Sequence, residues 1–346
     1  MTGPAAAGLR IGIRLPPCRP AGELAEAART AERLGFDRAW FPDSQLLWRD
    51  VFATLTAAAL ATGRIGLGSA VTNVVTRHPS VLASAARTVA ELAPGRFVLG
   101  VGAGNSSVLP AGLPVSTRAQ LRERVAVVRG LLAGAECQLG AVRGRLRDPG
   151  PPVPVYLAAS GPRNLALAGE LADGVILLSG VWAEGLAASR RQVERGARAA
   201  GRSLSELDLV VSAYCHVTDD VARDARLLKP VCAAMAQAGG GPALRLAGVE
   251  VRVPAEVPDV YPDLAHAEDW ERAVRRSGQW VSDRAAVRFA EAFCLFGTVD
   301  QIAGRVGELA AAGVTSLFLQ HVGSYSVPYQ LMEQVAPVLA ARPVAG

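Results

Sequence analysis

Five short polar segments of this sequence contain the residue types that bind anions and transfer protons. They are residues 41–50, 70–79, 102–107, 159–164 and 179–180, and each follows an apolar, strand-like stretch. Carboxyl, hydroxyl and amide groups in such segments serve as general acids, as general bases or as hydrogen-bond partners of a ligand. They can act together only if the fold brings the ends of those stretches to one place.

The segment Ser160-Gly161-Pro162-Arg163-Asn164 lies at a junction between a strand and the start of a helix. Backbone N–H groups and the helix dipole make such a junction an anion site. Gly161 lets a phosphate approach the backbone, Arg163 adds positive charge, and Pro162 suits a first helical turn. An ordinary helix capped by Ser160 explains the same residues, so both interpretations stay open.

Asp43 lies at the end of the second strand-like stretch. A buried carboxylate there could accept hydrogen bonds from a ligand or carry a proton, and an N-cap for the next turn is the alternative. Trp48 could line a substrate pocket or pack in the core. Asn73 and Thr76 could bind a ligand or form a turn, whereas His78 is expected to have a structural role at the start of a helix.

Strand-like and helix-like segments alternate along the chain. Strands are expected at 9–15, 37–41, 65–72, 97–102, 155–158, 174–178, 207–216 and 316–320. Helices are expected at 21–34, 50–61, 79–91, 117–132, 161–171, 183–200, 219–238, 299–312 and 327–341. Strands alternating with helices indicate βαβ units and a parallel sheet. Eight such strands form a (β/α)8 barrel, an α/β TIM barrel whose active site lies at the carboxyl ends of the strands.

Two Gly- and Pro-rich stretches, 133–154 and 239–283, interrupt this alternation. We expect them to be insertions after the fourth and seventh strands of a single domain, 1–346, that form lids or substrate pockets rather than a second core. A doubly wound sheet is the alternative fold. It needs a glycine-rich turn after the first strand, and the turn here is Pro16-Pro17-Cys18.

The composition argues against several classes of protein. Half of the residues are apolar, enough for a large core, and only 19% are charged, which favours a homodimer that covers apolar surface. The net charge of +5 comes from scattered arginines, so no nucleic-acid partner is expected. Five cysteines without a C-x-x-C pair and four separated histidines predict neither a disulfide framework nor a metal site. No membrane segment or signal peptide is recognisable, which predicts a cytoplasmic protein.

Five pieces of the sequence, in the same order, resemble the luciferase-like monooxygenase family. They are residues 43–50, 71–79, 100–105, 160–175 and 296–300. Among the branches of that family, the chain is most similar to the methylenetetrahydromethanopterin-reductase-like proteins, which use coenzyme F420. The resemblance covers nearly the whole chain and is weakest over 239–283. It implies an F420-dependent oxidoreductase on a luciferase-like barrel.

The resemblance also implies roles for single residues. Ala70-Val71 is the position of a cis, non-proline peptide behind the cofactor ring, and the cofactor phosphate is expected at Ser160-Gly161 with Ser179 and Gly180 nearby. The implied cofactor-binding residues are Asp43, Ala70, Val71, Thr72, Asn73, Asn105, Ala159, Ser160, Gly161, Arg163, Asn164, Ser179 and Gly180.

Three departures from the family patterns narrow the reaction. Alcohol-oxidising branches have a histidine where this chain has Ser44, related branches have an acid at Asn105, and the pterin branch has a glutamate at Arg14. A reductase that delivers hydride to an electron-poor C=C, C=N or C=O bond of a small molecule needs little acid–base help. The catalytic candidates are Asp43, Ser44 and Asn105, with Tyr325 as a further proton donor, and the substrate candidates are Arg14, Trp48 and Ser106.

Three alternative functions stay open. A flavin mononucleotide (FMN) monooxygenase on the same barrel would share the phosphate site. A non-catalytic barrel could bind flavin without turnover. A barrel enzyme acting on phosphate-bearing substrates would usually place its phosphate site after strands seven and eight, and the candidate here follows strand five. Arg14 is a substrate ligand only if it points into the site, and it is a surface residue if it points outward.

Overall fold

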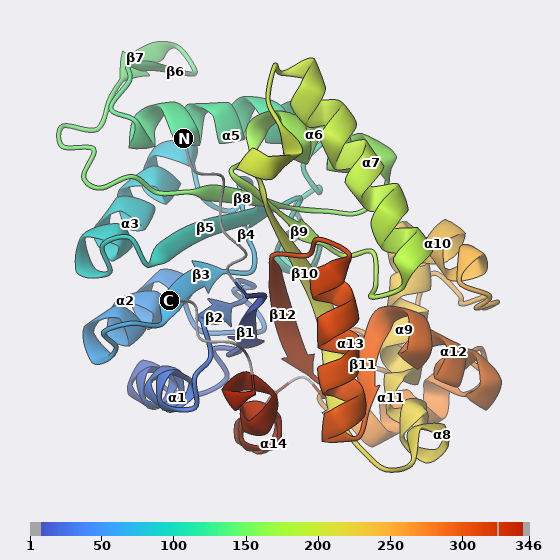
Figure 1. The fold of residues 1–346 in the computed structure, drawn as a ribbon. Helices are drawn as coiled ribbons and strands as arrows, with labels where there is room; N and C mark the ends of the chain where they lie inside the picture. The colour runs from blue at the N-terminus through green and yellow to red at the C-terminus, as the bar shows by residue number, and fades with distance from the viewer. Residues whose placement is uncertain (1–7, 324, 342–346) are drawn as a thin grey trace. The chain divides into compact units, whose positions relative to one another are not determined.

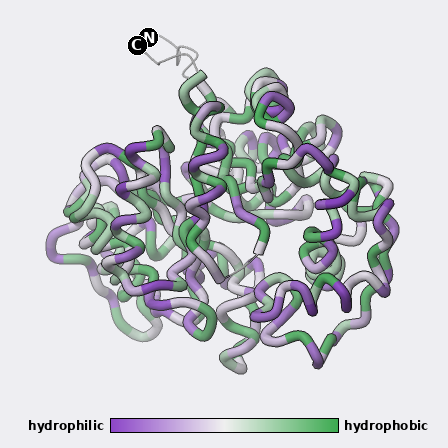
Figure 2. Tube along the Cα trace, turned by 90° about the horizontal axis from the view of Figure 1, so that it is seen from below, coloured by the Kyte–Doolittle hydropathy of each residue, from purple (hydrophilic) through white to green (hydrophobic). Residues whose placement is uncertain are grey.

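The structure is a computed structural model, and it describes residues 8–323 and 325–341 (Figure 1). Within these residues the chain forms two compact units. Unit 1 consists of 8–11, 178–188 and 211–341, and unit 2 consists of 12–177 and 189–210. Hydrophobic and hydrophilic positions alternate along most of the chain in Figure 2, as expected of helices and strands that bury one face.

The strands confirm the expected fold class. They are β1 (Arg10–Arg14), β2 (Arg38–Phe41), β3 (Gly66–Ser69), β5 (Phe97–Gly102), β8 (Val155–Ala159), β9 (Gly174–Leu177), β10 (Asp208–Val217) and β12 (Ser316–His321). Their pairing order is β10-β12-β1-β2-β3-β5-β8-β9, and β10 also pairs with β9. This cyclic order, with helices between the strands, is that of a (β/α)8 barrel. The short strand β4 (Thr72–Asn73) pairs with β5.

Helices follow the strands largely where the sequence predicts them. They include α1 (Ala21–Arg33), α2 (Val51–Ala61), α3 (Pro79–Leu92), α5 (Arg118–Leu132), α6 (Pro162–Leu171), α7 (Ala183–Ala199), α13 (Val299–Ala311) and α14 (Tyr329–Ala340). Local capping fixes several starts: the Asp50 side chain accepts from the backbone N–H of Ala53 in α2, and Thr117 and Thr298 form capping boxes in α5 and α13.

The helix predicted at 219–238 is wrong as one helix. The structure has α8 (Val221–Asp224), a 3₁₀ turn and then α9 (Lys229–Met235). Pro230 explains the interruption, because its ring lacks an N–H and conflicts with the carbonyl four residues earlier in a continuous helix. The sequence also left α12 (Asp283–Phe293) and β11 (Cys294–Gly297) unassigned.

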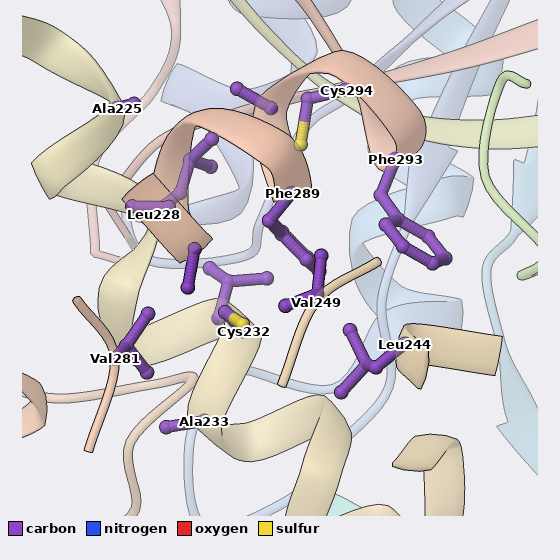
Figure 3. Close-up of a cluster of buried hydrophobic side chains, with 14 of the residues drawn as sticks. Ala225, Leu228, Cys232, Ala233, Leu244, Val249, Val281, Phe289, Phe293 and Cys294 are labelled. Carbon is purple, nitrogen blue, oxygen red and sulfur yellow. The ribbon is translucent and has the colours of Figure 1, made fainter. Parts of the chain in front are cut away.

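The stretch 133–154 contains an antiparallel hairpin, β6 (Cys137–Leu139) and β7 (Val142–Gly144), which is labelled in Figure 1. The stretch 239–283 contains α10 (Gly241–Leu246) and α11 (Trp270–Ser277). Its buried residues Leu244, Val249 and Val281 join a hydrophobic cluster in unit 1 with Phe289 and Phe293 (Figure 3). This stretch therefore contributes buried side chains to a hydrophobic cluster, and its role as a lid or substrate pocket stays a prediction.

Glycines make room for a large aromatic side chain between the first strands of unit 2. Trp40 in β2 is fully buried. A Cβ on Gly12 of β1 would lie 2.6 Å from the indole nitrogen of Trp40, and a Cβ on Gly68 of β3 would overlap with the same ring. These two positions therefore require glycine for packing, and they keep β1 to β3 in register around Trp40.

Candidate active site

Asp43 follows β2 and is held by two donors from the segment after β3. Its side chain is 1% exposed. The Thr72 hydroxyl donates to Asp43 Oδ2 at 2.6 Å, and the Arg77 guanidinium forms an ion pair with the same oxygen. The alternative that Asp43 caps the turn after it is wrong, because its carboxylate accepts from the side chains of Thr72 and Arg77 and, among the described residues, not from a backbone N–H of that turn.

Arg77 connects this carboxylate to a second one. Its Nη2 donates to Asp50 Oδ2 at 2.7 Å, and its guanidinium carbon lies 5.2 Å from the ring centroid of Phe52. Burial alone lowers the pKa of Arg77, but the negative charges of Asp43 and Asp50 outweigh burial and raise it. Burial likewise raises the pKa of Asp50, but the Ala53 N–H and Arg77 outweigh it and lower that pKa. Arg77 and Asp50 therefore both favour their ionised forms.

The peptide bond between Ala70 and Val71 is cis, as the resemblance implies. Glycines of β5 let this segment approach closely. A Cβ on Gly102 would lie 2.7 Å from Val71 Cγ2, and a Cβ on Gly100 would overlap with the backbone oxygen of Ser69. The glycine pattern of β5 therefore has a packing reason of its own, independent of any ligand.

Two hydroxyl contacts join the carboxyl ends of β2, β4 and β5. The Ser44 and Ser106 hydroxyl oxygens lie 2.8 Å apart. The Asn73 amide donates to Ser107 Oγ at 2.9 Å, and Asn73 Oδ1 accepts the backbone N–H of Thr76 at 2.8 Å. Asn73 is fully buried, and its side-chain oxygen accepts from the backbone of Val75 and Thr76, as in the turn-forming alternative. Two of the predicted site residues, Ser44 and Ser106, thus meet through their side chains. Asn73 instead contacts Ser107, which was not among the predicted site residues.

Other predicted residues differ in exposure. Arg14 and Trp48 are each 5% exposed, and the Arg14 guanidinium carbon lies 5.6 Å from the Trp48 ring centroid. The alternative that Arg14 is a surface residue is therefore wrong. Asn105 is exposed and follows Gly104, whose φ of 94° favours glycine. Tyr325 is 56% exposed, and His78 caps α3, which confirms its structural role.

The start of α6 has no side-chain cap. Gly161 is the N-cap residue, with a φ of 65° and no capping side-chain hydrogen bond, so the alternative that Ser160 caps this helix is wrong. Ser160, Gly161, Arg163 and Asn164 are exposed. A Cβ on Gly161 would have no neighbour within 4 Å. A helix of ten residues with an open, uncapped N-terminus can accept an anion.

Ser179 and Gly180 lie in unit 1, just after β9. The Ser179 carbonyl accepts a hydrogen bond from the indole of Trp182 at 3.2 Å. Gly180 has a φ of 84°, and a Cβ there would lie 2.5 Å from the backbone oxygen of Ala292. Both features give Gly180 a structural reason to be glycine, and a phosphate role for the pair stays a prediction.

Arg77 is the main residue of the site that sequence reasoning missed. Sequence alone assigns Arg77 no individual role, because its two carboxylate partners are 34 and 27 residues away along the chain. Across 8–323 and 325–341, no three His, Cys, Asp or Glu side chains gather as a metal site would require. Over the same residues, none of the helices has the length and apolar character needed to cross a membrane.

The sequence is similar to a known protein family and to individual proteins of known function. The family model described as luciferase-like monooxygenase matches residues 6–316. The 5,10-methylenetetrahydromethanopterin reductase of Methanolobus tindarius is 30% identical over 319 residues, which cover 89% of this chain and 93% of the relative. The F420-dependent glucose-6-phosphate dehydrogenase of Beutenbergia cavernae is 36% identical over 216 residues, which cover 56% of this chain and 63% of the relative.

A solved structure agrees with these sequence relatives. The coenzyme F420 dependent tetrahydromethanopterin reductase from Methanopyrus kandleri has a TM-score of 0.72 and 25% sequence identity to this chain. The superposition covers 96% of this chain and 99% of that one. The similarity therefore extends over the complete barrel of the relative.

Proposed function

Because the chain belongs to the luciferase-like monooxygenase family, we propose that it is a coenzyme F420-dependent oxidoreductase. Its reaction is reduction: hydride passes from reduced F420 to an electron-poor C=C, C=N or C=O bond of a small molecule. The observation that carries the proposal is the similarity to a methylenetetrahydromethanopterin reductase over 89% of the chain. The same similarity supports an enzyme rather than a non-catalytic flavin-binding barrel.

The residues after β2, β3 and β8 fit this cofactor. Asp43 and Thr72 are polar groups beside the cis peptide Ala70-Val71, where a planar ring would lie. The uncapped start of α6 at Gly161 offers backbone N–H groups to a phosphate. We assign the ring-binding role to Asp43, Ala70, Val71, Thr72, Asn73 and Asn105, and the phosphate-binding role to Ala159, Ser160, Gly161, Arg163, Asn164, Ser179 and Gly180.

The bound cofactor supplies the hydride, and the side chains supply orientation and a proton. Asp43 is engaged by Arg77 and Thr72, so it serves to bind and orient. The Ser44 and Ser106 hydroxyls are hydrogen-bonded to each other, so the pair can relay a proton from water to the product. Each hydroxyl gives up one proton and accepts another, and both are neutral before and after the transfer. Arg14 and Trp48, both buried, are the candidate substrate contacts.

The direct test is a fluorescence titration of the purified protein with oxidised F420 and, in the same buffer, with FMN. Saturable binding of F420 alone supports the proposal, and electron-poor alkenes and imines would then be screened with reduced F420. Binding of FMN alone contradicts it and favours the monooxygenase alternative. Binding of neither cofactor contradicts both functions.

We further propose that the chain is a single catalytic domain and that two copies form a homodimer. Leu60 on α2 and Val81 on α3 are 71% and 56% exposed, and α2 carries no charged residue. A second copy covering these helices would remove this apolar surface from water. Light scattering of the purified protein gives the oligomeric state, and a monomer over a broad concentration range would contradict the dimer.

The cysteines support a cytoplasmic location, which we propose for this protein. Cys18, Cys137, Cys215, Cys232 and Cys294 are all free. Disulfide-free proteins with several cysteines are typical of reducing compartments. Cell fractionation with a tagged copy of the complete chain is the measurement, and recovery outside the cytoplasmic fraction would contradict the proposal.

A further inference from the structure

One arginine connects the segments that follow β2 and β3. Arg77 Nη1 pairs with Asp43, which follows β2 after Pro42, and Arg77 Nη2 donates to Asp50 at 2.7 Å. Asp50 is at the other end of the same loop, where it caps α2. Arg77 itself lies between β4 and α3. A single guanidinium thus fixes both ends of one loop against the next.

The contacts of Asp43 extend this connection to the cis peptide. Thr72 donates to the same Asp43 oxygen that Arg77 binds, and Thr72 immediately follows the cis bond between Ala70 and Val71. The position of the Asp43 carboxylate and that of the Val71 backbone are therefore coupled through one hydrogen bond. Any shift of Asp43 is transmitted to the residues proposed to face the cofactor ring.

Burial distinguishes this ion pair from the surface pairs of the chain. The side chains of Arg77 and Asp43 are 12% and 1% exposed. Arg122 and Glu170 form a comparable two-point pair between α5 and α6, but their side chains are 48% and 30% exposed. Water can replace a partner in the second pair, whereas a buried carboxylate that loses its cation has no such replacement.

We propose that Arg77 is a positioning residue for the cofactor site: it holds Asp43, and through Asp43 and Thr72 the cis-peptide segment, in the geometry that binds the cofactor ring. Arg77 acts through Asp43 and does not itself contact the ring. This inference rests on the proposed function. It adds to it a residue that the sequence analysis did not include among the cofactor-binding residues.

The geometry of the guanidinium is what the role requires. Arginine presents several N–H donors in a planar fork and can bind two carboxylates along separate directions. A lysine ammonium keeps the charge but is a point donor on a flexible stem. Arg77→Lys should therefore keep the charge balance of the loop and lose the simultaneous hold on Asp43 and Asp50.

The experiment measures cofactor affinity and stability in parallel. The protein and its Arg77→Lys and Asp50→Ser variants are titrated with oxidised F420, and their unfolding temperatures are recorded. Asp50→Ser keeps an N-cap oxygen for α2 but removes the second carboxylate. Arg122→Lys is the matched control, because it changes a two-point arginine pair away from the site. The absorption band of bound F420 reports the environment of the ring independently of affinity.

We expect Arg77→Lys to bind F420 about 10- to 100-fold more weakly, because small displacements of positioning groups have effects of this size. Its bound cofactor should also show a shifted absorption band. Asp50→Ser should have a smaller effect in the same direction, and Arg122→Lys should match the unsubstituted protein in both readouts. These results would support the positioning role.

A variant without either charge separates positioning from folding. Arg77→Met alone leaves the Asp43 charge buried, so the variant with both Arg77→Met and Asp43→Asn is used instead. We expect it to fold and to bind F420 weakly with a shifted band. Unchanged affinity and band in Arg77→Lys, or affinity losses that only follow unfolding temperature in every variant, would overturn the inference. If the unsubstituted protein binds FMN instead, the same variants are titrated with FMN, and failure to bind either cofactor overturns the proposed function itself.

Discussion

Within unit 2, the amino-terminal and carboxyl-terminal ends of the strands hold their arginines in different ways. At the amino-terminal ends, the guanidinium carbon of Arg38 lies 5.1 Å from the Trp40 ring centroid and 5.9 Å from that of Tyr156. The Tyr156 hydroxyl donates to Asp208 at 2.6 Å. At the carboxyl-terminal ends, Arg77 instead binds two carboxylates, and one of them is almost fully buried.

Close packing of side-chain volume determines which residues fit around Trp40, whereas pairing of opposite charges determines which residues fit around Asp43. Around Trp40, the neighbouring strands carry glycine because no further atom fits. Such a close-packed region is sensitive to added volume. Around Asp43, the chain tolerates a buried charge because Arg77 and Thr72 supply donors, and this region is sensitive to the loss of one partner. The first region stabilises the barrel by close packing, and in the function proposed above the second positions groups for chemistry.

The largest expected effect is a volume change beside the buried Trp40 ring. Gly68→Ala places a Cβ where it overlaps with an atom of that ring, and we expect it to lower the free energy of unfolding by about 3 kcal/mol. Denaturant unfolding measures this effect. Gly22→Ala in α1 is the control, because a Cβ there meets nothing within 4 Å. Combining Gly68→Ala with Trp40→Phe should recover part of the loss, and equal stability of the two alanine variants would contradict packing by shape.

A charge change at the carboxyl-terminal ends should have the next largest effect. Asp43→Asn keeps the size of the side chain but removes the charge that Arg77 pairs with. We expect a loss of about 2 kcal/mol in the free energy of unfolding, as for other hydrogen bonds to buried charged groups, together with weaker F420 binding. Glu170→Gln is the matched control, since exposed pairs contribute about 1 kcal/mol or less. Similar losses in both variants would remove the distinction between the two regions.

The fold was predictable because buried parallel strands give continuous apolar runs. The run at 97–102 matches β5 at both ends. The pattern Ala286, Phe289, Ala290 and Phe293 also has helical spacing, and it marks α12, which the sequence analysis left unassigned. The broken helix around Pro230 was missed because apolar spacing was given more weight than proline.

The site was predictable only in part. Asp43 and Thr72 were found because both lie at carboxyl ends of strands, which is a rule of the fold. Arg77 was not found, because its role depends on carboxylates that are distant in the sequence and close only in the folded chain. The packing role of Gly102 was invisible for the same reason, since its neighbour Val71 lies between β3 and β4, far from Gly102 in the sequence.

Alkaline pH should weaken the amino-terminal region selectively. Burial, together with the negative charge of Asp208, raises the pKa of Tyr156 to about 12, against an ordinary value of about 10. The folded state therefore favours the neutral phenol, whose contribution is complete below about pH 10 and is lost as the pH rises through about 12. Tyr156→Phe should flatten the loss of stability over this range, and parallel unfolding curves for the two proteins would contradict the assignment.

The smallest effect on stability is expected from removing a neutral hydroxyl at the carboxyl-terminal ends of the strands. Ser106→Ala removes one hydroxyl from the pair with Ser44, which should cost about 1 kcal/mol. If that pair passes a proton to the product, Ser44→Ala and Ser106→Ala should keep F420 affinity and lower turnover, with a changed solvent isotope effect. Turnover and isotope effect are measured with reduced F420 and an accepted substrate. Unchanged values in both variants would leave the carboxyl-terminal region with a binding role alone, in which charge at Asp43 and Arg77 orients the cofactor and water delivers the proton directly.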